Sequence, residues 1–503
     1  MAARTWAKEF QRAAALLEAD LPLAAMERLA ACGATARARE DAPALLWVAI
    51  ATAHAYASLE QPGRGLQALT EAEVASAGAS PALRLAAREA LARFHLAVHR
   101  PQQALAIAVA ALAEGEALAG ERTRSGGELP RIPSPARSLA CLWVHRAAAE
   151  AAREKWAEAA SAAAQAAAAM RRLKDDAGWA EALYWMGRSD AAMGRTDDAE
   201  RHLTAALRRD EAAHRSRAEA RDHSALAALA EDLGQSEPAM AHGSAALGLL
   251  WSRVGRLDRW DVARLCHLFG TILAGTGDRQ LAIQCLSRAA AYYGQSGDHE
   301  AALAASVALD GLLRETSGEG GPTPSLPDDL RARVRALTTM LGLLDDLAST
   351  DPHLERHATV VTGYALRLAS AMRIPADRMS ALVHACRLYH LGQSAAGEGP
   401  AHPVLGAELL RAFPLPEQTL TAVRHFRERW DGGGYPQGLA GAEIPQLARL
   451  LALVDGYVSL ALDPAEPLPH SGALALVRAR AGTAYDPAVV DAFSRLHEAA
   501  ATE

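Results

Sequence analysis

The sequence predicts an all-α fold. The amino-acid composition, the spacing of apolar residues and the positions of the glycines lead to this conclusion. Half of the 503 residues are hydrophobic but only 5% are aromatic, and alanine is abundant, which suits many small-faced helices packed closely together. Apolar residues recur at helical spacing through most of the chain. Several glycines fall between the periodic stretches, where a helix would have to stop.

Residues 1–315 are predicted to form a solenoid of helix pairs. Small residues recur in pairs seven positions apart, and a new pair begins about every forty residues along most of this region. Small side chains at such positions let two helices cross with their backbones close together. The pairs are Ala25/Cys32, Ala68/Ala75, Ala104/Ala111, Ala159/Ala166, Ala199/Ala206, Ala239/Ala246 and Ala282/Ala289.

Glycines precede several of these pairs, and we expect each to end a first helix: Gly63, Gly194, Gly234 and Gly277. Further small residues lie seven positions before the expected turns, at Ala92, Ala147, Gly187, Ala227 and Gly270. With this pattern, residues 184–207 and 267–289 resemble tetratricopeptide repeats. That resemblance implies a concave surface for a protein or peptide partner. Because the unit exceeds the standard ~34 residues, we expect extended helices or turns.

Three further segments complete the predicted organisation. A Gly-, Pro- and Ser-containing stretch at 121–138 indicates a loop inserted between repeats, and a helix at 298–314 is expected to cap the solenoid. Residues 316–329 read as a linker because glycine, proline and serine dominate them. A C-terminal domain is therefore expected over 330–503.

The C-terminal domain is organised around a loop that cannot be a helix interior, Asp431-Gly432-Gly433-Gly434-Tyr435-Pro436. Consecutive glycines allow positive φ, and a proline lacks the N–H donor that a helix needs. Apolar residues recur at helical spacing on both sides of this loop. The order is therefore helix, rigid loop, helix.

Residues 424–457 resemble the signature of HD-GYP domains, which are bacterial signalling domains of all-helical fold. The shared positions are Glu428 to Gly432, Gly434 to Pro436, Gly438-Leu439, Gly441, Glu443 to Pro445 and Ala448-Arg449. A histidine-bearing entry helix around His357 and a terminal segment, Tyr485 to Phe493, extend the resemblance to about 330–498. Many members hydrolyse cyclic di-GMP at a two- or three-metal centre, so the resemblance implies a cluster of histidine and carboxylate ligands.

Only part of that ligand set is present. His402, in a His-Pro-x-x-Gly element, and Asp455 match family ligands, and His357 matches a recurrent family histidine. Tyr389 and His390 stand where the family has its His-Asp pair. Phe426 and Arg427 replace the family's double histidine, and His425 lies one residue too early. Losing residues that bind the metal directly should be worse than losing a residue that only hydrogen-bonds to such a ligand, which alone costs ~10–100-fold in affinity or activity.

Two interpretations of the remnant positions follow. His390, His402, His425 and Asp455 could converge on one divalent ion, Fe or Mn, although a shift of one helical residue rotates a side chain by ~100°. In the interpretation that we favour, no cofactor binds, His402 and Asp455 are packing residues, and Arg427 pairs with Asp455 or Glu428 in place of metal charge.

The sequence therefore favours a bacterial signalling adaptor that is not an enzyme. A protein or peptide would bind the solenoid, and the 431–436 loop either supports packing through Trp430 and Tyr435 or docks a diguanylate cyclase domain, as the family resemblance implies. One alternative is a cyclic di-GMP phosphodiesterase with a remodelled metal site. Another is a receptor that binds a cyclic dinucleotide without cleavage through Arg427, with Arg424 and Arg429.

Composition excludes several other classes. A net charge of −7 gives no excess of basic residues of the kind that binds a nucleic-acid polymer. No apolar run reaches the ~18 residues of a membrane span, and the N-terminus lacks a signal-peptide core. The five cysteines are scattered, which is typical of reduced thiols in a cytoplasmic protein.

Overall fold

The computed structural model describes residues 2–502 except 19–20, 60, 76–80, 98–99, 119–134, 253–258, 276–277, 296–297, 315–330, 333, 336–337, 340, 343–351, 397–398, 414 and 463–465. The described chain is predominantly helical, and its β-type pairing is confined to isolated bridges. The predicted all-α fold is therefore confirmed. Within the described residues, no helix has the length and apolarity needed to cross a membrane.

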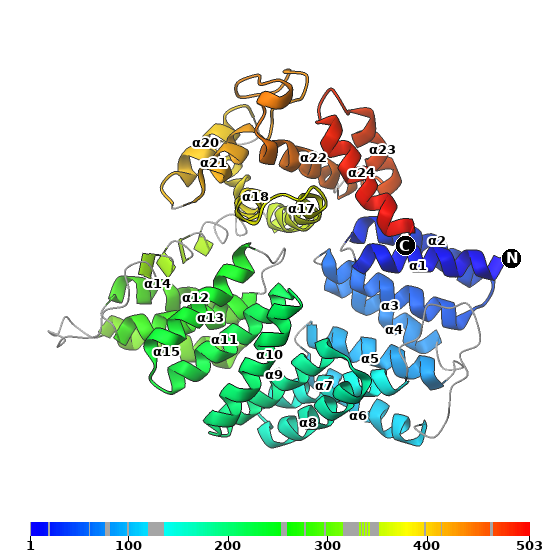
Figure 1. Ribbon diagram of the computed structural model, residues 1–503, viewed down its shortest axis with the longest axis vertical. Coiled ribbons are helices and arrows are strands. Elements are labelled where there is room, and N and C mark those ends of the chain that lie inside the picture. The colour runs from blue at the N-terminus through cyan, green and yellow to red at the C-terminus, as the bar shows by residue number, and fades with distance from the viewer. Residues whose placement is uncertain are drawn as a thin grey trace. The chain divides into compact units, whose positions relative to one another are not determined.

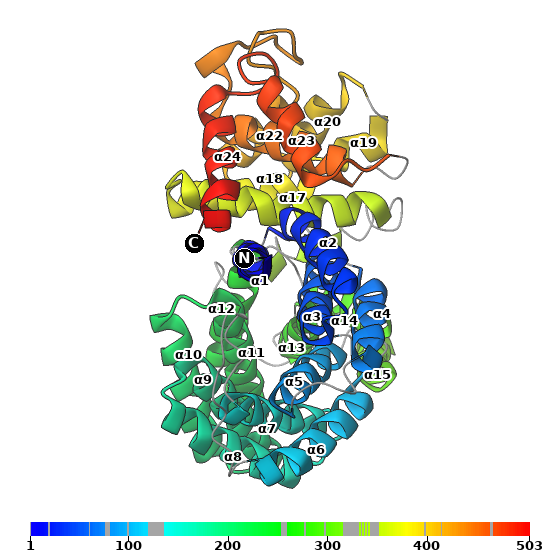
Figure 2. The ribbon, with the colours of Figure 1, turned by 90° about the vertical axis from the view of Figure 1, so that its right-hand side faces the viewer.

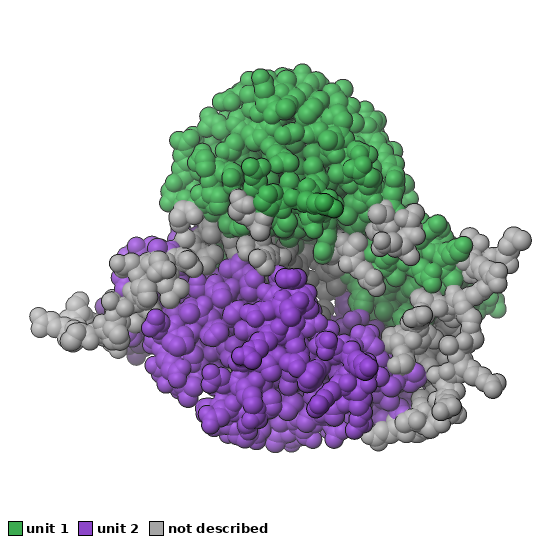
Figure 3. All heavy atoms as spheres, viewed as in Figure 1, with its two compact units in different colours: residues 1–80, 124–131, 340–503 green, residues 81–123, 132–339 purple. Residues whose placement is uncertain are grey.

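The chain divides into two compact units, coloured separately in Figure 3. Unit 1 contains residues 1–80, 124–131 and 340–503, and unit 2 contains residues 81–123 and 132–339. These limits differ from the predicted domains, because the first 80 residues group with the C-terminal helices. The expected linker at 316–329 lies outside the described residues, as does most of the expected loop at 121–138, whose last residues begin α7.

Unit 2 is a succession of helix pairs with short connections (Figures 1 and 2). Consecutive helices pack against each other, and odd-numbered helices also contact the next odd-numbered one, as in a solenoid. The helix expected at 298–314 is present as α15. The helices are α5 (Pro81–Ala97), α6 (Pro101–Leu118), α7 (Pro135–Ala151), α8 (Trp156–Leu173), α9 (Asp176–Ala192), α10 (Thr196–Ala212), α11 (Ser216–Asp232), α12 (Ser236–Ser252), α13 (Arg259–Gly275), α14 (Arg279–Gln295) and α15 (His299–Arg314).

The predicted small residues lie at the helix crossings of unit 2. Both members of every pair from Ala104/Ala111 to Ala282/Ala289 are fully buried. At Gly187 a β-carbon would lie 2.6 Å from Leu203 Cγ and 3.1 Å from a backbone oxygen of α10. At Gly270 it would lie 2.6 Å from Leu286 Cγ. These glycines therefore let α9 approach α10, and α13 approach α14.

The turns of unit 2 follow the prediction only in part. Gly194 and Gly234 end their helices with φ of +74° and +71°, as expected. Other turns use non-glycine residues in the same left-handed conformation, namely Glu154, Lys174 and His214. In unit 1, the prediction for Gly63 is wrong, because this residue lies in the first turn of α4. Gly277 lies outside the described residues.

Unit 1 combines helices from both ends of the chain. The N-terminal ones are α1 (Ala2–Glu18), α2 (Pro22–Ala38), α3 (Ala42–Ser58) and α4 (Pro62–Ala75). The C-terminal ones form a bundle of α17 (Pro352–Ala371), α18 (Ala376–Leu388), α19 (Leu391–Ala396), α20 (His402–Leu410), α21 (Glu417–His425), α22 (Gln446–Ala461), α23 (His470–Ala479) and α24 (Pro487–Thr502), with a 3-10 turn at Gly441–Glu443.

The N-terminal helices are fastened to the bundle by packing and by hydrogen bonds. Helix α1 packs on α24, and α2 packs on α23. The backbone N–H of Leu23 donates to the hydroxyl of Tyr364 at 3.1 Å. The Glu27 carboxylate accepts from the backbone N–H of Ser471 at 2.7 Å and from its hydroxyl at 2.6 Å. Because Ser471 lies in the first turn of α23, Glu27 satisfies an N–H group that the helix itself leaves unpaired.

We expect the substitution Gly187→Ala to destabilise unit 2 by about 1–3 kcal/mol, because the added methyl group would overlap Leu203 and a backbone oxygen. The measurement is the urea unfolding midpoint of the full chain.

Gly248→Ala is the matched control, since Gly248 lies in α12 and a β-carbon there would meet nothing within 4 Å. It should be neutral or stabilising by up to about 1 kcal/mol. Equal midpoints for the two variants would contradict the close approach of α9 and α10.

Candidate functional site

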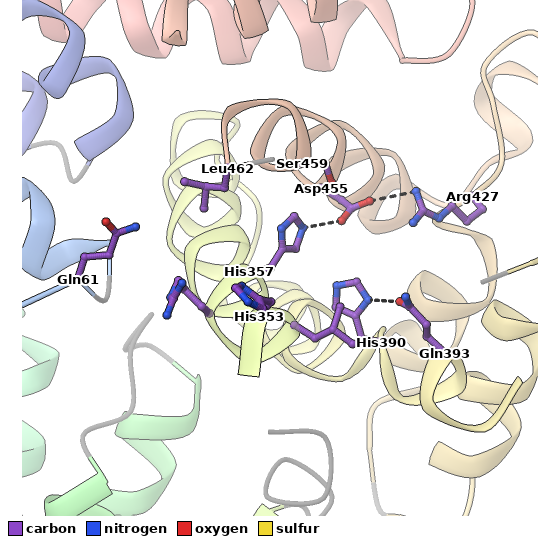
Figure 4. Close-up of a pocket in the computed structure, with 11 residues that line it drawn as sticks. Gln61, His353, His357, His390, Gln393, Arg427, Asp455, Ser459 and Leu462 are labelled. Carbon is purple, nitrogen blue, oxygen red and sulfur yellow. Dashed lines mark hydrogen bonds and ion pairs between the residues drawn. The ribbon is translucent and has the colours of Figure 1, made fainter. Parts of the chain in front are cut away.

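The centre of the C-terminal bundle is the carboxylate of Asp455 on α22, which is 2% exposed. Its Oδ1 accepts from the Tyr389 hydroxyl at 2.7 Å and from His357 Nε2 at 2.9 Å. Its Oδ2 forms an ion pair with an Arg427 guanidinium nitrogen at 3.2 Å, and Figure 4 shows both His357 and Arg427 directed at this carboxylate. Four segments of the bundle therefore meet at one buried negative charge.

The ionisation of this cluster follows from its contacts. Burial alone would raise the pKa of Asp455, but the hydrogen bond from His357 and the charge of Arg427 hold that pKa well below its ordinary value. Burial and the neighbouring Asp455 charge raise the pKa of Tyr389, so its phenol stays protonated. Asp455 is accordingly an anion that three surrounding donors stabilise. The Arg427–Asp455 pair expected from the sequence is present.

His390 lies beside this cluster in the turn after α18 and is 5% exposed. Its Nδ1 lies 2.9 Å from Gln393 Oε1, a contact in which Nδ1 carries the hydrogen (Figure 4). The lone pair is then on Nε2, a buried atom with no hydrogen-bond partner within the described structure. Burial lowers the pKa of His390 to about 4. Ligand atoms of His357, His390 and Asp455 all lie within 4.8 Å of one another.

His402 and His425 are not part of this group, which corrects the expectation that they converge with His390 and Asp455. Among the described residues, the metal-compatible grouping contains His357 instead. His402 opens α20, and its ring lies 5.4 Å from that of Phe426. His425 ends α21 with Nδ1 3.5 Å from a Glu428 oxygen. The next residue along, Phe426, packs edge-on to Tyr389, so one step of register separates His425 from the cluster.

A two-metal centre does not fit these residues. Both oxygens of Asp455 already hold donors, and His357 shares its Nε2 with this carboxylate. A metal bound to a carboxylate oxygen at ~2.1 Å would also lie near the Arg427 guanidinium. At an effective dielectric constant of ~20, a divalent ion ~5 Å from such a charge is destabilised by about 7 kcal/mol. This repulsion opposes the attraction that the Asp455 carboxylate would exert on the ion.

The loop at 431–436 is held by a buried acid that precedes it. Glu428 is 3% exposed, and its two oxygens accept from the backbone N–H groups of Gln437 at 2.8 Å and Leu439 at 3.1 Å. At Gly434, a β-carbon would lie 2.3 Å from the backbone nitrogen of Arg429, so only glycine fits there. The sequence motif contained Glu428 but did not reveal this role. A buried acid next to a glycine-rich loop was the available signal.

The outer side of this loop is exposed to solvent. Trp430 and Tyr435 are half-buried rather than fully buried supports, and Asp431 is exposed. Gly432 adopts φ of +79°, and Tyr435 precedes Pro436 through a cis peptide bond. The loop is therefore both a packing element and an accessible surface.

Two of the three arginines that could bind a cyclic dinucleotide are already paired with carboxylates. Arg429 forms two hydrogen bonds with Asp431, and Arg424 forms an ion pair with Glu408 at 3.1 Å. Arg427 is the member of this group that lines the pocket beside Asp455.

That pocket has a volume of about 280 Å³ and lies within unit 1 (Figure 4). Most of its wall comes from the C-terminal bundle, but Gln61 comes from the connection between α3 and α4. The lining residues are Gln61, His353, Leu354, Arg356, His357, His390, Gln393, Arg427, Asp455, Ser459 and Leu462. Neither Gln61 nor Arg356 was found by sequence reasoning, since no local motif marks either residue.

Comparison with known proteins bears on the C-terminal part. A family model described as an HD domain matches residues 398–489. The chain is 47% identical over 68 residues to a probable cyclic di-GMP phosphodiesterase of Vibrio cholerae, covering 13% of this chain and 15% of the relative. It is 40% identical over 99 residues to the cyclic di-GMP phosphodiesterase response regulator RpfG of Xanthomonas campestris, covering 19% and 26%.

A longer match links residues of this chain to the cyclic di-GMP phosphodiesterase PA4108 of Pseudomonas aeruginosa, with 28% identity over 186 residues, 33% of this chain and 45% of the relative. The chain thus spans less than half the length of each of these relatives. Among solved structures, BtubC from P. vanneervenii matches with a TM-score of 0.32 and 15% identity, over 54% of this chain and 97% of that one, a likeness too low to bear on fold or function.

We expect Glu428→Ala to loosen the 431–436 loop, because two partly buried N–H groups lose their acceptor at about 1–3 kcal/mol. Hydrogen exchange at the amides of Gln437 and Leu439 should accelerate. The control is Glu417→Ala, an exposed carboxylate at the start of α21, which should leave both amides unchanged. Unchanged protection in Glu428→Ala would refute the anchoring role.

His390 should make the stability of unit 1 depend on pH. The unfolded chain takes up a proton near pH 6.5, whereas the folded side chain does so only near pH 4, so stability is lost as pH falls between these values. The loss from this residue is about 3 kcal/mol at most. Unfolding midpoints from pH 7 to 4.5 should fall less steeply for His390→Gln than for the native chain. Parallel curves would contradict this expectation.

Proposed function

We propose that this chain, whose C-terminal part is an HD-GYP-like domain, acts in cyclic di-GMP signalling as an adaptor that does not hydrolyse the nucleotide. The observation that carries the proposal is the Arg427 guanidinium, 3.2 Å from the buried Asp455 carboxylate. A fixed positive charge there takes the place of a cation.

The chemistry of phosphodiester hydrolysis explains why this matters. Metal-dependent hydrolysis needs cations that polarise the phosphate and generate a nucleophilic hydroxide from water. In this chain the Asp455 oxygens are occupied by His357, Tyr389 and Arg427. The arginine binds a carboxylate tightly but does not deprotonate water at neutral pH. With both oxygens engaged, Asp455 is not free to hold the cations that hydrolysis requires.

The remaining surfaces supply the adaptor's contacts. The solenoid-like helix pairs of unit 2 offer an extended face for a protein or peptide partner. The 431–436 loop, with exposed Asp431 and half-buried Tyr435 and Pro436, offers a docking surface for a diguanylate cyclase domain. The buried Glu428 keeps that loop in shape without any metal.

A second candidate is a metal-dependent cyclic di-GMP phosphodiesterase with a remodelled site. The names of the relatives favour it, as does the grouping of His357, His390 and Asp455 within 4.8 Å. Its weakness is the charge of Arg427 next to that group.

Metal content separates these candidates. We expect the full chain, purified and then incubated with Mn²⁺ or Fe²⁺ under anaerobic conditions, to hold far less than one ion per molecule and to show no turnover of cyclic di-GMP. Elemental analysis and nucleotide chromatography give the two readouts. Stoichiometric metal with turnover that disappears in His357→Ala would overturn the adaptor proposal.

A gain-of-ligand variant serves as the matched comparison. Tyr389→His, His390→Asp, Phe426→His and Arg427→His together restore the ligand types that the family resemblance implies at these positions. If the missing ligands account for the lack of metal, this variant should retain more metal than the native chain.

A further inference from the structure

A second pocket lies in unit 2, between α11 and α13, two helices that Figure 1 labels. Arg264 donates to the Ser224 hydroxyl through Nε at 3.1 Å and through Nη2 at 2.6 Å, and the Thr271 hydroxyl donates to the Glu231 carboxylate. Both contacts join residues 40 positions apart. Because they follow each other in the same direction along the two helices, α11 and α13 lie parallel and in the register of the repeat.

The pocket carries a different charge at each end. Ser224 and Glu231 are seven residues apart on α11, so the two ends lie ~10 Å apart at ~1.5 Å per residue. Arg264 occupies the Ser224 end, and Asp232 joins Glu231 at the other. This separation is about one Debye length at ~0.1 M ionic strength, so salt weakens the effect of the arginine on the acidic end. The wall between the ends is apolar and is formed by Ala228, Leu265 and Leu268.

The acidic end has no cation of its own. Glu231 is half-buried and Asp232 is exposed, and neither forms an ion pair within the described residues. Burial raises the pKa of Glu231, and the neighbouring Asp232 charge raises it further. Arg264, by contrast, already has oxygen partners in Ser224 and Tyr184. The pocket therefore holds a partly desolvated negative charge that a ligand cation can neutralise, whereas its arginine is engaged.

Two rings that line the pocket add no charge to it. Burial lowers the pKa of His267, so its imidazole is neutral at neutral pH, and burial raises the pKa of Tyr293, so its phenol stays protonated. Their centroids lie 6.1 Å apart in an edge-to-face arrangement. The described lining thus carries two carboxylates, Glu231 and Asp232, against one guanidinium. A cation gains net attraction in this pocket, and aromatic ring faces attract cations as well.

We propose that this pocket receives a lysine or arginine side chain from an extended segment of the adaptor's protein partner. The basic head pairs with Glu231 and Asp232, and its aliphatic stem packs on the apolar wall. The volume of about 320 Å³ lies at the lower end of the ~300–1,000 Å³ of small-molecule sites, which suits one long side chain. The inference rests on the proposed function, because it specifies the partner that the helix pairs of unit 2 bind.

The arginine end adds a second requirement. An extended segment advances ~3.3 Å per residue, so in a segment that lies along the pocket the third residue from the bound basic one reaches Arg264. A second basic side chain at that place meets a like charge, which disfavours it. The pocket therefore selects a single basic residue at a defined place and rejects an uninterrupted basic run.

Peptide selection tests this specificity. A random peptide library displayed on phage is selected against the full chain and, separately, against Glu231→Gln, which keeps the side-chain shape and removes the charge. Peptides selected on the native chain should share one lysine or arginine that those selected on the variant lack. The matched control is Glu211→Gln, an exposed carboxylate in the last turn of α10 and outside the pocket, which should select the native motif.

Fluorescence anisotropy with one selected peptide measures the ion pair itself. Glu231→Gln should weaken binding about 10- to 100-fold, the range for a hydrogen bond to a charged group. Glutamine in place of the peptide's basic residue should weaken binding similarly, and both changes together should cost no more than either alone. The peptide change leaves the protein intact, so it separates loss of the ion pair from loss of folding. Added salt should weaken binding to the native chain more than binding to Glu231→Gln.

A basic motif that depends on Glu231 supports the proposal. The proposal is overturned if no peptide is enriched, if the selected peptides share no basic residue, or if Glu231→Gln binds the selected peptide as tightly as the native chain does. Peptides that bind independently of Glu231 would remove this pocket and leave the adaptor function standing. Metal-dependent turnover of cyclic di-GMP would instead overturn the adaptor function, and the peptide measurement does not depend on that outcome.

Discussion

The C-terminal bundle depends on one buried charge. Asp455 would be very costly to bury alone, so the surrounding segments must supply donors to it. His357 comes from α17, Tyr389 from the end of α18 and Arg427 from the turn after α21, while Asp455 itself lies on α22. The cluster therefore holds four segments of the bundle together through hydrogen bonds and an ion pair.

This arrangement balances the buried Asp455 charge with protein side chains. Here a phenol, an imidazole and a guanidinium surround the carboxylate at hydrogen-bonding or ion-pair distances. Removing one partner from such a buried pair is strongly destabilising, typically by about 3–5 kcal/mol, because it leaves an uncompensated buried charge. The same logic applies to Glu428, whose carboxylate serves the loop backbone rather than a ligand.

The sequence predicted features that follow from local chemistry and missed those set by distant contacts. Small residues at Gly187 and Gly270 were assigned to helix crossings because size and spacing alone require it. The left-handed turn at Lys174 carries no glycine, so the sequence held no local signal for it. The sequence did not decide whether His425 faces the site, because a shift of one residue along a helix rotates a side chain by ~100°. The hydrogen bond from Leu23 to Tyr364 joins residues 341 positions apart and has no local signal at all.

The discontinuity of unit 1 also constrains how the chain folds as it leaves the ribosome. Its first 80 residues must wait for residues 340 onward before they find the surface on which they pack. At translation rates of ~5–20 residues per second, the roughly 400 residues between residue 80 and the end of α23 and α24 take about 20–80 seconds. During this interval the apolar faces of α1 and α2 that later meet α24 and α23 are uncovered. The nascent chain is therefore a natural client for chaperones until its last helices emerge.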